Sequence, residues 1–291
     1  MKPFFSIIIP LFNASSKLPQ LLESVSLQRC RNFEVVFMDG ASTDNTLDIV
    51  ADFVKNNKKQ PVIVHSSPDH GIYDAMNRGV DWASGEWLYF MGSDDSFCDA
   101  GVLEEVKDVL EREKADLIYG NVVGISGTTR YVYNTEDKVL SKGIHHQSVF
   151  YRHSLFDDFG KYDLKFPVAA DYDFTLKVFL NDSYRIRYIN RDIAYYGESG
   201  FSSVNFDYKF FCGHYRLLKC NKALDRIADP DKCLSDSVYC CYHLAGTKKN
   251  LALAWRNLLF YVFFVKKATL NFRIKVFYNM LKRTVRRPLL T

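Results

Sequence analysis

The stretch GEWLYFMGSDDSF places two adjacent carboxylates, Asp94 and Asp95, shortly after the apolar run at residues 87–91. Neighbouring carboxylates repel each other unless a cation lies close to both. Carboxylate oxygens suit Mg²⁺ and Mn²⁺, and these ions keep positions open for the oxygens of a phosphate. The pair therefore predicts a metal-assisted phosphate site. One alternative stays open: the acids cap a helix that begins near Ala100.

Apolar runs alternate with helical patterns over the first 120 residues, and these elements must position the two acids. The runs lack regular polar alternation, as in parallel strands that helices cover on both faces. We therefore predict an α/β fold with a mostly parallel, Rossmann-like sheet. The predicted strands are residues 4–10, 33–39, 62–65, 87–91 and 116–120. The predicted helices are residues 16–27, a segment capped by Thr43 or Asp44, residues 72–83 and a segment before residue 116.

Polar residues follow each of the first four predicted strands. Asn13 follows the first strand, Asp39 ends the second, residues 65–69 follow the third, and the two acids follow the fourth. Because ligands of such sheets bind outside the carboxyl ends of the strands, we expect these groups in one crevice. The chain has neither G-x-G-x-x-G after the first strand nor G-x-x-x-x-G-K-[ST], which argues against dinucleotide and P-loop sites. A cation must then neutralise most of the phosphate charge.

Five blocks occur in a fixed order between Ser6 and Ser203: SIIIPLFN, VVFMDGASTDNT, DHGIYDAMNRGVDWASGEWLYFMGSDD, HHQSVF and AADYDF. On these blocks the chain resembles the family 2 glycosyltransferases. The resemblance implies a GT-A fold, Mn²⁺ or Mg²⁺ as cofactor, and inverting transfer of a sugar from a nucleotide sugar, which we expect to be UDP-linked.

The resemblance assigns nucleotide-sugar binding to Pro10 and Asn13, in the opening strand and turn, and to Asp39. A carboxylate at the Asp39 position would accept the N3–H of uracil and so discriminate between base edges. Capping of the following helix is the alternative role, for which Ser42, Thr43 and Asp44 are better placed.

The same resemblance makes Asp95 the principal metal ligand. Ser93 stands where a strict D-x-D motif has its first acid. Two roles therefore stay open for Asp94: binding the ribose, or contacting the metal through a water molecule. The resemblance places His145 and His146 beside the pyrophosphate, and we assign His146 to the metal. A packed, hydrogen-bonded histidine is the alternative.

Three polar residues, Asp74, Asn77 and Arg78, lie on the helix predicted at residues 72–83. Asp74 and Arg78 are four residues apart and share a face. We assign all three to the nucleotide sugar, because a turn at Gly71 lets the backbone approach a ligand closely. For Arg78 a surface ion pair is the alternative.

The block PVAADYDF carries the expected catalytic base. An acceptor hydroxyl is a poor nucleophile at neutral pH until a carboxylate removes its proton. By resemblance that carboxylate is Asp171. Ala170 stands where Glu is common in the family, so a share of the role for Asp173 stays open.

The bulk composition fits a globular protein of one large domain with an appendage: 291 residues, 47% hydrophobic and 25% charged. Seven cysteines without a C-x-x-C pair fit neither a disulfide framework nor a zinc site, and predict a reducing, cytoplasmic location. The N-terminal apolar run is broken by Pro10 and predicts a strand, not a signal peptide.

The tail differs in charge from the rest of the chain. After Asp236 there are eleven Lys and Arg and no Asp or Glu, so the tail is +11 and the remainder, with 38 − 11 = 27 basic against 34 acidic residues, is −7. We predict a catalytic domain at residues 1–203 and a helical, basic extension at residues 204–291. Basic residues interleave there with Trp255, Phe260, Phe263, Phe264, Phe272 and Phe277.

This composition predicts peripheral contact with the inner face of the cell membrane. The longest apolar run, eight residues after Asn257, is too short to span a bilayer. Helices packed on the catalytic domain with a basic outer face are the alternative. Nucleic-acid binding is not expected, because no recognisable reading module is present.

Together these features predict sugar transfer to a hydroxyl of a glycan or lipid-linked acceptor in surface polysaccharide synthesis. Two other functions are alternatives, and sequence features argue against each. A nucleotidyltransferase should carry a basic, glycine-rich loop after the first strand, and the chain has PLFNASSK there. A catalytically silent membrane tether would not need Asp39, Asp95 and Asp171 together.

Overall fold

The computed structural model describes residues 2–57, 59–198, 200–247, 250–264 and 269–285; for residues 201, 203, 264 and 285 only the backbone is described. Two compact units divide the chain. The first comprises residues 2–135 and 143–204, and the second residues 136–142 and 205–285, within the described part. Residues 136–142, predicted within the catalytic domain, thus belong to the second unit.

The first unit is built on a parallel half-sheet with the order β3-β2-β1-β4. Its strands are β1 (Phe5–Leu11), β2 (Phe33–Asp39), β3 (Val62–Ser66) and β4 (Trp87–Phe90). Every residue of β1, β2 and β4 is buried, which agrees with the continuous apolar runs in the sequence. The predicted parallel sheet is confirmed in this half.

The other half of the sheet is mixed and continues the order as β8-β6-β9-β5, with β7 beside β6. β8 runs antiparallel to β4 and to β6, whereas β6 and β9 are parallel. The strands are β5 (Ser96–Phe97), β6 (Leu117–Gly124), β7 (Arg130–Tyr131), β8 (Val149–Arg152) and β9 (Ile186–Tyr196). Because β5 directly follows Asp94 and Asp95, these acids do not cap α4 (Val102–Arg112).

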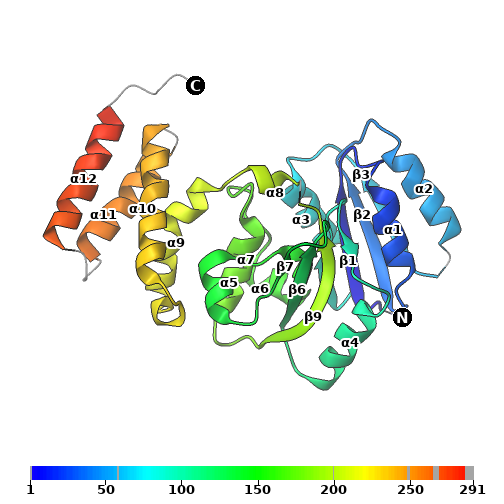
Figure 1. The fold of residues 1–291 in the computed structure, drawn as a ribbon. Coiled ribbons are helices and arrows are strands. Elements are labelled where there is room, and N and C mark those ends of the chain that lie inside the picture. The colour runs from blue at the N-terminus through cyan, green and yellow to red at the C-terminus, as the bar shows by residue number, and fades with distance from the viewer. Residues whose placement is uncertain (1, 58, 199, 248–249, 265–268, 286–291) are drawn as a thin grey trace. The chain divides into compact units, whose positions relative to one another are not determined.

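Helices cover the sheet, with α1 and α2 on one face and α3 on the other (Figure 1). α1 shows why these segments fold as helices: Leu18, Leu21, Leu22 and Val25 recur at helical spacing and are all buried. The remaining helices of this unit are α2 (Thr46–Asn56), α3 (Ile72–Trp82), η1 (His146–Ser148), α6 (Ser154–Phe159), α7 (Ala170–Phe179) and α8 (Phe201–Val204); α1 spans Leu18–Ser26.

The second unit is helical in its described residues, as predicted for the tail. The side chains of Asp207 and Asp229 cap α9 and α10 by accepting hydrogen bonds from Phe210 N and Lys232 N. The seven cysteines of the chain are free. The helices are α5 (Glu136–Lys142), α9 (Tyr208–Cys220), η2 (Leu224–Arg226), α10 (Pro230–Gly246), α11 (Leu251–Phe264) and α12 (Leu270–Val285).

Candidate active site

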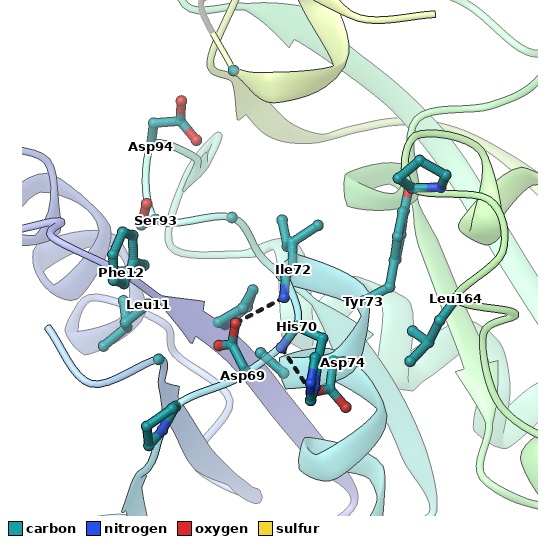
Figure 2. Close-up of a pocket in the computed structure, with 18 of the residues that line it drawn as sticks. Leu11, Phe12, Asp69, His70, Ile72, Tyr73, Asp74, Ser93, Asp94 and Leu164 are labelled. Carbon is teal, nitrogen blue, oxygen red and sulfur yellow. Dashed lines mark hydrogen bonds and ion pairs between the residues drawn. The ribbon is translucent and has the colours of Figure 1, made fainter. Parts of the chain in front are cut away.

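A pocket of about 670 Å³ opens beyond the carboxyl ends of the parallel strands, where the sequence placed it. Figure 2 shows Leu11, Phe12, Ser93 and Asp94 on one side of the pocket and Tyr73 and Leu164 on the other. Four of the predicted site residues lie in or near its wall. Pro10, Asp74 and Asp94 line the pocket, and Asp171 contacts the lining residue Tyr73.

Asp94 lines the pocket and contacts a lysine. Its Oδ2 lies 3.1 Å from Lys17 Nζ at the start of α1. A Cβ atom on Gly197 would lie 2.5 Å from Asp94 Cγ, so only glycine lets the chain after β9 pass this carboxylate. Asp94 is therefore held at the rim between a cation and a close backbone segment.

Asp95, in contrast, is buried and ties three segments together. It accepts hydrogen bonds from Gly92 N at 2.8 Å, from Gln147 Nε2 at 2.8 Å and from Gly197 N at 3.0 Å. Burial raises the pKa of Asp95 to about 6, against the lowering influence of His146 and these hydrogen bonds. The first role that the structure shows for Asp95 is to fix the loop that presents Asp94.

Asp39 and Asn13 also act on backbone and neighbouring side chains. Buried Asp39 accepts hydrogen bonds from Ser42 N and from the hydroxyls of Ser42 and Ser66. Asn13 Oδ1 accepts from Thr43 N at 2.8 Å, with Asn13 itself at a φ of 47°. Neither residue is among those that line the pocket. Both shape the turns after β1 and β2, and their nucleotide contacts stay predictions.

Asp74 and Arg78 form the ion pair that was the alternative role for Arg78, with Nη2 and Oδ2 2.7 Å apart, and Arg78 is not among the pocket-lining residues. Asp74 also accepts from His70 N at 2.9 Å, and Arg78 Nη1 donates to Pro68 O at 2.9 Å. Burial raises the pKa of Asp74, but the hydrogen bonds from His70 and the Arg78 charge outweigh it and lower the pKa below its ordinary value. The pair stiffens the loop that leads into α3.

Asn77 does not line the pocket. Its amide donates to Tyr162 O and accepts from Tyr162 N, both at 2.9 Å. It is 8% exposed and is not among the lining residues. A buried amide with both ends bonded to backbone is a structural tie, and the structure does not bring Asn77 together with the other predicted site residues.

Asp171 lies at the N-terminus of α7 with both carboxylate oxygens engaged. Oδ1 accepts from the Tyr73 hydroxyl at 2.7 Å, and Oδ2 lies 3.3 Å from His146 Nδ1. Asp173 instead pairs with Lys177, at 2.6 Å between Oδ2 and Nζ. Of these two acids, Asp171 is the one whose hydrogen bond reaches a residue of the pocket wall, Tyr73.

His146 has an open coordination position. Its Nε2 is buried and has no hydrogen-bond partner among the described residues. Burial lowers the pKa of His146, but the bond to Asp171 and the charges of Asp95 and Asp94 outweigh it and raise the pKa. A histidine that donates Nδ1–H to a carboxylate presents Nε2 for metal binding.

The donor set suits a divalent cation in part. Carboxylates at Asp94 and Asp95 and the free Nε2 of His146 are the ligand types that Mn²⁺ takes. No three metal-ligating side chains come together within the described ranges, so such an ion would depend on substrate oxygens and water for other ligands. His145 does not join this set: it bonds the Tyr133 hydroxyl, and burial lowers its pKa to about 4.

The pocket wall contains Asp69, from the segment 65–69 that the sequence placed at the crevice; it accepts from Gly71 N at 2.8 Å. Phe12, which lines the pocket and is 65% exposed, and Tyr73 had not been assigned a role from the sequence. Tyr73 contacts the expected base. Their position after β1 and in the first turn of α3 was the available signal, because these segments end at the predicted crevice.

Comparisons with known proteins agree with this architecture. A PGL/p-HBAD biosynthesis glycosyltransferase of Mycobacterium bovis (strain BCG / Pasteur 1173P2) is 43% identical over 201 residues, 68% of this chain and 78% of the relative. An uncharacterized glycosyltransferase of Mycobacterium tuberculosis is 32% identical over 186 residues, 61% of this chain and 70% of the relative.

Two solved structures share the fold. S. aureus TarS 1–349 in complex with UDP-GlcNAc has a TM-score of 0.64 at 21% identity, covering 98% of this chain and 82% of TarS. Mannosyltransferase PcManGT from Pyrobaculum calidifontis, in complex with GDP-Man and Mn²⁺, has a TM-score of 0.62 at 16% identity, covering 98% and 88%. Residues 6–187 match the family model described as Glycosyl transferase family 2. The chain therefore belongs to glycosyl transferase family 2 and has the GT-A fold.

Proposed function

We propose that the protein transfers a sugar from a UDP-linked donor to a hydroxyl of a glycan or lipid-linked acceptor, with inversion at the anomeric carbon. The observation that carries the proposal is the Tyr73–Asp171 hydrogen bond, which joins a carboxylate to the wall of a pocket rimmed by Asp94. Family membership favours sugar transfer over the nucleotidyltransferase and the silent tether.

The pocket has suitable places for the parts of a nucleotide sugar. The exposed ring of Phe12 offers a flat surface for a base beside the end of β1. Asp94 lies on the same side of the pocket as Phe12, with Ser93 between them in Figure 2. A ribose or a cation-bound diphosphate would lie beside Asp94. A nucleotide laid between Phe12 and Asp94 would follow the carboxyl ends of β1 and β4 (Figure 2).

Asp94, Asp95 and His146 carry the atoms that would ligate the divalent cation; because they do not form a three-ligand cluster in the described residues, substrate oxygens and water would complete its ligands. When bound, that ion would offset negative charge on the departing diphosphate. The Mn²⁺ in the mannosyltransferase complex and the UDP-GlcNAc in the TarS complex support this cofactor and donor class for the present chain.

Asp171 is proposed as the base. Its carboxylate would accept the acceptor's proton as the hydroxyl oxygen attacks the anomeric carbon on the face opposite the diphosphate, which gives inversion. The bonds from Tyr73 and from its own helix terminus, Tyr172 N at 2.8 Å, orient the carboxylate. The proton on Tyr73 stays in place, since burial raises the pKa of that phenol well above its usual value.

The acceptor class rests on the relatives. The mycobacterial relative is named for biosynthesis of PGL/p-HBAD, and this supports a glycan or lipid-linked hydroxyl acceptor here.

Calorimetry with UDP and GDP, each with and without Mn²⁺, tests the donor site. We expect UDP to bind more tightly than GDP and to need the cation. Product analysis by NMR, after a donor screen finds the sugar, tests the stereochemistry. Retention of the anomeric configuration would overturn the proposed single displacement, and equal binding of both nucleotides would overturn the assignment of a UDP-linked donor.

A further inference from the structure

Helix α12 in the second unit uses one face for packing. Val276 and Met280 are 4% and 0% exposed, and the Tyr242 hydroxyl of α10 donates to Val276 O at 3.1 Å. The rings of Trp255 on α11 and Phe277 pack edge to face, with centroids 5.7 Å apart. These contacts fix which side of α12 faces its neighbours.

A second apolar face of α12 is exposed in the described part of the chain. Leu270, Ile274, Tyr278 and Leu281 are 72%, 58%, 62% and 43% exposed. They recur at intervals of four, four and three residues, so with 3.6 residues per turn they form one stripe about 80° to 100° wide. We call these four residues the α12 stripe. A soluble surface rarely exposes so many large apolar side chains in one row.

The charges beside the stripe are all positive. Lys275 and Lys282 are exposed, lie seven residues apart and therefore flank the same side of the stripe. The sequence of α12 contains no Asp or Glu, and the residues after Asp236 carry eleven cations and no acid. An apolar stripe with a row of lysines along its edge is the pattern of a helix lying in a lipid interface.

We propose that the α12 stripe inserts into the interface of an anionic membrane, with Lys275 and Lys282 at the headgroups. A second copy of the chain fits the stripe less well, because self-pairing would bring lysine rows together with no acid on α12 to balance them. A spanning role does not apply: among the described helices, none is both long and apolar enough to cross a bilayer. This inference goes beyond sugar transfer and does not depend on it.

The aromatic residues of the tail that the sequence singled out differ in exposure. Phe263 on α11 is 65% exposed and Phe277 is 40% exposed. Trp255, Phe260 and Phe272 are half-buried, and Phe260 lies 5.1 Å from the Arg216 guanidinium. The side chain of Phe264 lies outside the described residues. Most of these aromatic side chains that the structure describes are therefore not exposed, whereas all four residues of the α12 stripe are.

Co-sedimentation of the full chain with vesicles tests the proposal. We expect binding to vesicles that contain phosphatidylglycerol, weaker binding to pure phosphatidylcholine, and further weakening as salt rises from about 50 mM to 500 mM. The double variant Ile274→Glu/Leu281→Glu should lower partitioning at least about tenfold. The double variant Lys275→Gln/Lys282→Gln should lower it about tenfold on anionic vesicles only.

Matched controls use exposed residues of the first unit. These controls replace an exposed isoleucine (Ile125→Glu) and two exposed lysines (Lys55→Gln/Lys114→Gln) outside α12. Both control variants should bind vesicles as the unaltered chain does. Thermal melts and UDP binding show whether each variant is folded, so that loss of vesicle binding is read separately from loss of donor binding.

Three results would overturn the proposal. These are equal binding to neutral and anionic vesicles, unchanged binding of the stripe variant, and a dimer in light scattering that the stripe variant abolishes.

Discussion

Two histidines, one in each unit, show how differently the same side chain can be used. His146 faces carboxylates from two segments, Asp171 at the start of α7 and the Asp94–Asp95 loop, and its buried Nε2 has no described partner; its pKa is raised. His214 on α9 has Nε2 bonded to Leu140 O at 2.9 Å, and burial lowers its pKa to about 4. The contrast teaches that burial alone does not mark a functional histidine. The open nitrogen beside acidic groups is what makes His146 the candidate ligand.

The largest expected effect concerns the acid that His146 contacts. Asp171→Asn keeps the shape of the side chain and one acceptor oxygen for the Tyr73 hydroxyl but cannot accept a proton, so we expect transfer to slow by about 10² to 10⁴-fold with donor affinity nearly unchanged. Steady-state kinetics and UDP calorimetry measure the two quantities. Asp173→Asn is the matched control, since Asp173 pairs with Lys177. If Asp173→Asn were the slower variant, the base assignment would be wrong.

The helical unit should respond to pH through His214. The unfolded chain binds a proton at His214 below its ordinary pKa of 6.5, whereas the folded chain does so only near pH 4. The contribution of His214 to the free energy of unfolding is therefore fully present above pH 6.5. As the pH falls towards 4, the free energy of unfolding decreases by about 3 kcal/mol at most.

Urea unfolding between pH 7 and pH 4, followed by a signal from the second unit, measures this dependence. His214→Gln should flatten the curve relative to the unaltered chain. Equal slopes for the two proteins would show that His214 does not titrate as its burial requires.

Asn77 offers a test inside the catalytic unit. Asn77→Ala leaves the backbone groups of Tyr162 without their partners, so we expect a loss of about 2 kcal/mol in the free energy of unfolding. UDP affinity in the folded variant should stay within a factor of three. A larger loss of UDP affinity without loss of stability would restore the role in donor binding that the sequence suggested.

His146→Gln sharpens the comparison most directly. Removing the open nitrogen should weaken UDP binding in the presence of Mn²⁺ at least about tenfold. In EDTA, the residual UDP affinity of the variant should equal that of the unaltered chain. His214→Gln is the matched control, because it alters a buried histidine of the other unit. Calorimetry with Mn²⁺ added stepwise checks both variants. Identical Mn²⁺ dependence in all three proteins would leave His146 as a packing residue.

The parallel half of the fold could be predicted from the sequence because its strands are continuous apolar runs. β2 was placed at residues 33–39, as observed, and β1, β3 and β4 within one residue at each end. In the mixed half the sequence predicts only β6, at residues 116–120 against the observed Leu117–Gly124. β8 and β9 could not be predicted, because they gain their places through pairing with strands far along the chain. Local pattern does not specify such partners.

The site shows the same limit. Sequence placed Asp39, Asn13 and Asp95 at strand ends correctly, but it could not show that Ser42, Thr43 and Gly197 donate to them. A carboxylate at a strand end serves a ligand or a turn equally well on residue type alone. The Tyr73–Asp171 contact spans 98 residues and has no signal in spacing.

The bonds to Asp95 also bear on the order in which the molecule forms. Its partners Gln147 and Gly197 lie 52 and 102 residues further along the chain. A nascent chain that ends before residue 147 contains both acids but neither distant partner, so the rim of the pocket can be completed only after β9 has emerged and paired. The Gly197 amide should accordingly exchange its hydrogen slowly, at a rate set by opening of the whole first unit.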